Sequence, residues 1–272
     1  MNPYSSLICD DFGIYVYANT KMELPTRRET VLHFFDTIRK MYPKMTEFDT
    51  RESGEYVLEE DREEGTYRWA ALEPRRFSSG IYNPDSMEDA DNYHQRILEV
   101  APYHLDFHLL DCSALDVMFA FDLNCSGNHD EVVTEALGLH PALENLLGDT
   151  HAKVLDYQPS LMISLDESCR LQGRLHIETR TNPYQVRTNQ YSDVPITVYF
   201  RLRQYWDGQA ITSLNEPMSE DRLPSLNTGK PEDVVAALQE SYRNQRRMCQ
   251  EIVDEHIVPA ILQPLSQTIK AR

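Results

Sequence analysis

Several short segments alternate apolar and polar residues, and this period of two most constrains how the chain can fold. Successive side chains of a β-strand point to opposite faces, so alternation predicts strands with one face in a core and the other face open. An antiparallel sheet commonly has one buried face and one open face, whereas a parallel sheet is usually covered on both faces. The segments with strand character are 12–19, 55–60, 66–72, 77–83, 104–109, 115–124, 160–167, 170–181 and 195–206.

Other segments carry apolar residues at helical spacing, which predicts amphipathic helices. In the first of them, Thr26 and Glu29 have the spacing of a capping box, and Asn128 and Glu131 repeat that relation further along. The predicted helices span 26–42, 86–101, 128–137 and 231–258, and three of them are expected to end or kink at Pro43, Pro102 and Pro259.

The order β-α-β-β-β-α occurs twice along the chain. We therefore predict an α+β fold in which antiparallel sheet packs on helices, built from a duplicated unit and ending in a long C-terminal helix. The two halves are expected to form one compact pseudo-symmetric unit. Their predicted bounds are 1–102 and 103–258, with insertions at 138–150 and 206–230 and a C-terminal tail at 259–272.

The composition is that of a globular protein, with 41% hydrophobic and 26% charged residues. No apolar run approaches the roughly 18 residues that span a membrane, and the N-terminus lacks the basic and apolar regions of a secretory signal. The five cysteines are odd in number and form no C-x-x-C pair, so free thiols are expected rather than disulfides or a zinc site. These features predict a cytoplasmic protein without a membrane partner.

The formal net charge of −18 would repel a phosphate backbone, so nucleic acid is not expected as a partner. The charge is unevenly distributed, however. Residues 47–64 hold nine acidic side chains against two arginines, whereas residues 170–205 hold six arginines against two acidic side chains. The second region is therefore the part of the chain where an anionic partner could bind.

His104, Asp106 and His108 alternate with apolar residues, which predicts the exposed face of a strand. A strand rises about 3.3 Å per residue, so His104 and His108 would lie about 13 Å apart. Zinc ligands must converge to about 2 Å from one ion, so these two histidines cannot share a metal along a strand. We predict no metal site here.

The sequence carries no recognisable local motif for covalent catalysis or nucleotide binding. There is no G-x-S-x-G elbow, no phosphate-binding loop and no G-x-G-x-x-G, and the chain has only ten glycines. We therefore assign no catalytic residue and expect no cofactor.

The strongest functional signal lies in the segments 170–181 and 195–206. Alternation places leucine, isoleucine, valine and phenylalanine on one face of each predicted strand, and arginine, histidine and tyrosine on the other. Guanidinium groups bind carboxylate and phosphate in a bidentate manner and stack on aromatic rings, although the same residues also pair structurally across exposed strands. The candidate ligand-binding residues are Arg174, His176, Arg180, Tyr199, Arg201, Arg203 and Tyr205.

Three functional hypotheses follow. The first is a non-enzymatic binding or assembly module whose Arg/Tyr-rich sheet face receives an anionic small molecule or an acidic protein segment. The second is a hydrolase-like enzyme with its site in a cleft between the halves, using His104, Asp106, His108 or His176 for acid–base chemistry. The third is a structural homo-oligomer built on the predicted helix 231–258, whose apolar stripe is interrupted by Gln245.

Overall fold

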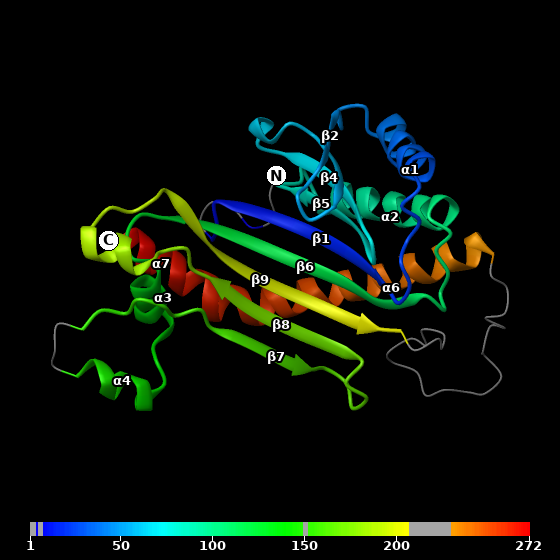
Figure 1. Cartoon of the computed structure of the whole chain (residues 1–272). Helices are drawn as coiled ribbons and strands as arrows, with labels where there is room; N and C mark the ends of the chain where they lie inside the picture. Colours follow the sequence, from blue (N-terminus) through cyan, green and yellow to red (C-terminus); the bar gives the residue numbers. More distant parts are fainter. Residues whose placement is uncertain (1–3, 5–7, 149–151, 207–229) are drawn as a thin grey trace.

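The computed structural model describes residues 4, 8–148, 152–206 and 230–272, and its strands form one antiparallel sheet (Figure 1). The order of the nine strands across the sheet is β2-β3-β4-β5-β1-β6-β9-β8-β7. The strands are β1 (Asp11–Thr20), β2 (Glu47–Thr50), β3 (Tyr56–Glu59), β4 (Tyr67–Glu73), β5 (Arg76–Tyr82), β6 (Cys112–Cys125), β7 (Ser160–Ser164), β8 (Leu171–Glu178) and β9 (Val194–Tyr205).

The helices are α1 (Arg28–Met41), α2 (Met87–His104), α3 (His129–Leu137), α4 (Pro141–Leu147), α5 (Pro183–Thr188), α6 (Pro231–Ile252) and α7 (Gln263–Ala271), with a 3₁₀ turn η1 (Arg62–Glu64) and a π-helical segment η3 (Val253–Leu262). The two longest, α2 and α6, lie on one face of the sheet (Figure 1). The long α6 packs on β6 and β9, and α2 packs between α6 and β5 (Figure 1). None of the helices among the described residues is long and apolar enough to cross a membrane.

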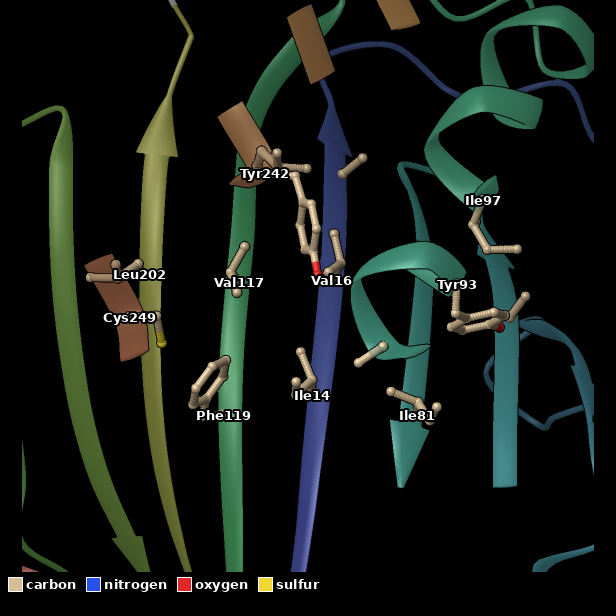
Figure 2. Close-up of a cluster of buried hydrophobic side chains, with 14 of the residues drawn as sticks. Ile14, Val16, Ile81, Tyr93, Ile97, Val117, Phe119, Leu202, Tyr242 and Cys249 are labelled. Carbon is tan, nitrogen blue, oxygen red and sulfur yellow. The ribbon is translucent and has the colours of Figure 1, made fainter. Parts of the chain in front are cut away.

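The core lies between these helices and the centre of the sheet, where β1 pairs with β6. Ile14 is directly opposite Phe119 and Val16 is opposite Val117, and all four side chains are buried (Figure 2). Tyr242 of α6 lies over this part of the sheet, and burying each large apolar side chain stabilises the fold by about 1.5–3 kcal/mol. The alternation in 12–19 and 115–124 therefore reports which face of each strand enters the core.

The α+β class, the antiparallel sheet and the long C-terminal helix are confirmed. The predicted first half supplies β2, β3, β4, β5 and β1, and the predicted second half supplies β6, β9, β8 and β7, so the halves lie side by side in one sheet. Strand order alone does not establish duplication, which stays a prediction. Of the predicted insertion at 206–230, residues 207–229 lie outside the described residues.

The prediction of a strand at 104–109 is wrong. The helix α2 continues through Pro102 and ends at His104, and the following residues form a loop in which Asp106 has a φ of +51°. Leu105 and Phe107 are both buried, because the loop runs along the edge of the core, with Phe107 against Phe77. Leu105 and Phe107 are buried on either side of the exposed Asp106, so the loop has the alternating pattern of a strand although it pairs with no described strand.

One local prediction at a helix end also needs correction. The N-cap of α1 is Arg27, without a side-chain cap, so Thr26 does not form the predicted capping box, whereas Asn128 does cap α3. The predicted insertion at 138–150 contains α4, and the short edge strand β2 was not predicted because none of its residues is buried.

The C-terminal region is helical beyond the predicted end of the long helix. The residues around Pro259 form the π-helical segment η3, and α7 occupies most of the predicted tail at 259–272, with Leu265 buried. A proline removes one backbone donor, and a local π-helix is a known way to accommodate the missing hydrogen bond.

His94 provides a test of how tightly the helices close over the sheet. Its side chain is fully buried, its Nδ1 lies 2.8 Å from the Ser79 hydroxyl, and burial lowers its pKa to about 3. The folded pKa lies below the unfolded value of about 6.5, so the unfolded state binds one more proton between these pH values and stability falls as the pH falls.

We expect His94→Gln to reduce the dependence of the unfolding free energy on pH between about pH 6 and pH 4, by up to about 1.4 kcal/mol per pH unit. Urea unfolding at a series of pH values measures this slope. The exposed His256→Gln serves as the control. Equal slopes for the wild type and the His94 variant would contradict the burial of this ring.

Candidate functional site

The face of the sheet opposite the helices carries a row of side chains that crosses six strands. Trp69 pairs with Gly80, Gly80 with Tyr15, and the row then continues through β6, β9 and β8. Because each residue is the direct cross-strand partner of the next, the side chains all point to the same face. In order, the row is Trp69, Gly80, Tyr15, Met118, Arg201 and Arg174.

A hollow of about 470 Å³ lies over this row. Sites for small molecules commonly have volumes of roughly 300–1,000 Å³ and are lined by aromatic side chains with a few polar groups. We call it the open-face hollow. Its lining residues are Tyr15, Tyr17, Arg51, Trp69, Met118, Arg174, His176, Tyr199 and Arg201.

Aromatic rings form one side of the open-face hollow. The Trp69 indole lies flat against Gly80, where an added Cβ would come within 2.2 Å of the ring. The Tyr15 phenol lies over Gly13 in the same way, and its ring centroid is 5.7 Å from that of Trp69. The two glycines therefore let both rings lie close to the backbone of the sheet.

Arginines form the other side, and they differ in their pairing. Arg203 donates two hydrogen bonds of 2.7 and 2.6 Å to Asp116, whose side chain is only 2% exposed. Arg201 is also half-buried, but its Nη1 lies 3.8 Å from the same carboxylate, and no hydrogen bond to another described residue satisfies it. Burial lowers the pKa of Arg201, the nearby Asp116 carboxylate opposes this shift, and Arg203 and Arg174 add to it.

His176 and Tyr199 complete this side of the hollow. Their rings stack with centroids 6.3 Å apart, and the Tyr199 hydroxyl donates to Glu178 at 3.0 Å. Burial, followed by the nearby Glu178 carboxylate, raises the pKa of Tyr199 to about 12. The phenol is therefore a neutral hydrogen-bonding group at neutral pH.

The structure brings four of the seven predicted residues into the lining: Arg174, His176, Tyr199 and Arg201. Arg180 is committed to Glu178, Thr197 and the Pro195 carbonyl, and Arg203 is committed to Asp116. Tyr205 lies at the end of β9 with the Arg203 guanidinium 5.7 Å from its ring centroid. Whether any of the seven contacts a ligand stays a prediction.

The lining also contains residues from the first part of the chain that the sequence pattern did not single out, including Tyr15, Tyr17 and Trp69. The alternation in 12–19 already placed both tyrosines on the strand face opposite to that of Ile14 and Val16. The missing information was that β1 lies next to β6 in the sheet, since alternation reports a face and not a neighbour.

The acid–base groups of the enzyme hypothesis do not form one site. The His104 ring packs on His33 in the helical layer, with centroids 4.7 Å apart. Asp106 and His108 lie in the following loop, 3.5 Å apart and largely exposed, whereas His176 is on the opposite face of the sheet. Within the described ranges, no three His, Cys, Asp or Glu side chains are grouped so as to hold a metal ion.

The apolar stripe of the oligomer hypothesis packs inside its own chain. Leu238, Tyr242 and Cys249 are fully buried against the sheet, and Gln245 is buried with them, whereas His256 is exposed. These buried residues of the stripe are therefore not available to a second copy, whereas Val235 and Ile252 are half-buried, and a homo-oligomer through this helix stays a prediction.

The contact between Trp69 and Gly80 gives a first test of the site. We expect Gly80→Ala to push the indole away from β5, to change the near-UV circular dichroism and to destabilise the fold by about 1–3 kcal/mol. The matched control is Gly173→Ala in the same sheet, where the nearest atom to an added Cβ is 3.5 Å away. Equal effects of the two substitutions would contradict the placement of Trp69.

The two neighbouring arginines of β9 give a second test. Arg203→Gln would leave the buried Asp116 carboxylate without its main partner, so we expect a loss of about 2–3 kcal/mol in urea unfolding. Arg201→Gln removes a guanidinium without a close acceptor and is expected to change stability by less than about 0.5 kcal/mol. The reverse order of the two losses would show that Arg201 is the structural residue.

Comparison with protein-family models, with curated proteins and with solved structures finds no match to this chain. The inference about function therefore depends on the open-face hollow itself. The first half of the chain supplies Tyr15, Tyr17, Trp69 and Arg51 to its lining, and the second half supplies the other residues, including Arg174 and Arg201; the two sets meet across the pairing of β1 with β6.

Proposed function

We propose that this protein is a non-enzymatic binding or assembly module whose open sheet face receives an anionic ligand or an acidic partner. The observation that carries the proposal is Arg201, a half-buried guanidinium in the lining of the hollow that lies 3.8 Å from Asp116 and donates no hydrogen bond to a described residue. Arginine has five N–H donors in a planar fork, so most of the donors of Arg201 are open to a ligand. A carboxylate or phosphate would satisfy several of these donors at once.

The local charge favours the same ligand. Arg174, Arg201 and Arg203 face the same part of the sheet, and Asp116 is the carboxylate within reach of two of them. Both oxygens of Asp116 already accept from Arg203, so positive charge remains in excess beside the hollow. An anion is therefore attracted to this surface even though the whole chain carries a net charge of −18.

The lining supports binding rather than catalysis. His176 is the one histidine among the lining residues, and burial and the Glu178 carboxylate hold its neighbour Tyr199 neutral. General acid–base catalysis needs two positioned groups with different proton affinities, and the lining does not supply that pair.

The proposed location remains the cytoplasm. All five cysteines are free, and Cys169 is the exposed one. Unpaired thiols favour a reducing compartment, where disulfides are rare.

The proposal is tested by calorimetric titration with pyrophosphate and with a hexaglutamate peptide at salt concentrations between roughly 50 and 300 mM. We expect at least one of the two probes to bind, with an affinity that falls as salt increases. Arg201→Gln should weaken binding about tenfold or more, because it removes charge-assisted hydrogen bonds.

The matched control is Arg96→Gln, which makes the same change on the exposed surface of α2, where Arg96 pairs with Glu99. This variant should bind like the wild type. Failure of both probes to bind, or binding that ignores both salt and Arg201, would refute the proposed function.

A further inference from the structure

We infer that the ligand of the open-face hollow is a small planar aromatic anion, with its ring on the Trp69–Tyr15 side and its acidic group at Arg201 and Arg174. This inference rests on the proposed function and names the chemical class that the hollow would accept. It is carried by the order of side chains in the cross-strand row, in which aromatic and cationic residues occupy opposite ends.

The aromatic end is built to present flat surfaces. Glycine at positions 13 and 80 lets the Tyr15 and Trp69 rings lie against the strands, and both side chains are half-buried in the lining. Stacking of aromatic rings is favourable in offset and tilted arrangements by about 0.5–1.5 kcal/mol beyond the area that they bury. A planar unsaturated ring gains this interaction, and a saturated ring of the same size does not.

The spacing of the strands sets the length of the ligand. Neighbouring strands are about 4.8 Å apart, and β6 separates Tyr15 on β1 from Arg201 on β9, so about 10 Å lies between their backbones. Met118 lies between them on β6 and lines the floor of the hollow with a flexible apolar side chain. A fused ring with one acidic group extends over a distance of this order.

The same row disfavours an acidic protein segment as the occupant. Beyond Trp69, the row continues to Glu59 and then to Glu47, which are its direct cross-strand partners on β3 and β2. Glu59 is paired with Arg62, so the like charge that a chain of carboxylates lying across the strands would meet is that of Glu47, which is unfavourable. A ligand with a single anionic group at the Arg201 end does not reach Glu47.

The inference is tested by titrating the protein with three compounds that separate charge from planarity: naphthoate, its fully saturated decalin analogue, and neutral naphthamide. We expect naphthoate to bind at least about tenfold more tightly than either of the other two. Isothermal calorimetry on the wild-type protein measures this order without any substitution.

Two variants then assign each preference to its side of the hollow. Trp69→Leu should remove the preference for naphthoate over the decalin acid, whereas Trp206→Phe, which changes the other tryptophan, should leave it unchanged. Arg201→Gln should remove the preference for naphthoate over naphthamide, and Arg96→Gln should not.

The outcomes separate this inference from the proposed function. If the decalin acid binds as well as naphthoate, or if naphthoate does not bind, the aromatic class is wrong, and Arg201-dependent binding of pyrophosphate would still support the binding module. If hexaglutamate binds more tightly than naphthoate in an Arg201-dependent manner, the occupant is an acidic segment and the aromatic class is again wrong. If no probe depends on Arg201, both proposals fail.

Discussion

The pairing of β1 with β6 is the interaction on which the rest of the structure depends. These strands pair through almost their whole length at the centre of the sheet, and they join the two predicted halves of the chain. On the helical face this register brings Ile14 opposite Phe119 under α6, and on the open face it brings Tyr15 opposite Met118. A shift of one residue would reverse the faces of a strand, so the core and the open-face hollow are fixed by the same register.

One buried carboxylate determines how the arginines of the open face are paired. Asp116 is on β6, next to Arg203 on β9, and a buried carboxylate is stable only when it is paired. Arg203 meets this need with both of its hydrogen bonds, so Arg201, two residues earlier on the same strand, keeps only a longer contact of 3.8 Å to the same carboxylate. If the proposed ligand binds here, it meets a guanidinium already held on the sheet, which would lower the entropic cost of binding.

Alternation of apolar and polar residues in the sequence predicts which face of a strand is buried, but not which strands are neighbours. It identified the faces of β8 and β9, so Tyr199 and Arg201 were correctly expected on the side opposite Val198 and Phe200. It could not identify which strands are neighbours, so Trp69 and Tyr15 were not connected with the arginines, although they lie in one row. The pattern around His104 was misleading because burial of Leu105 and Phe107 in a loop has the same period as burial in a strand. Pairing energy between distant segments decides these points, and a single sequence does not encode it in a local pattern.

The C-terminal helix packs on its own sheet, so the helical face is covered and the opposite face carries the hollow. The α6 residues Leu238, Tyr242 and Cys249 are fully buried, and the Tyr242 hydroxyl donates to Asp91 of α2, so α6 is tied to both the sheet and its neighbouring helix. Arg246 of α6 also donates to Asp91, which adds a charged contact to the same junction. With its helical face closed in this way, the sheet is rigid, and its other face can carry close rings and a poorly paired arginine that an isolated hairpin could not hold in place. The packing of helices on one face of the sheet therefore allows the open face to hold a poorly paired arginine.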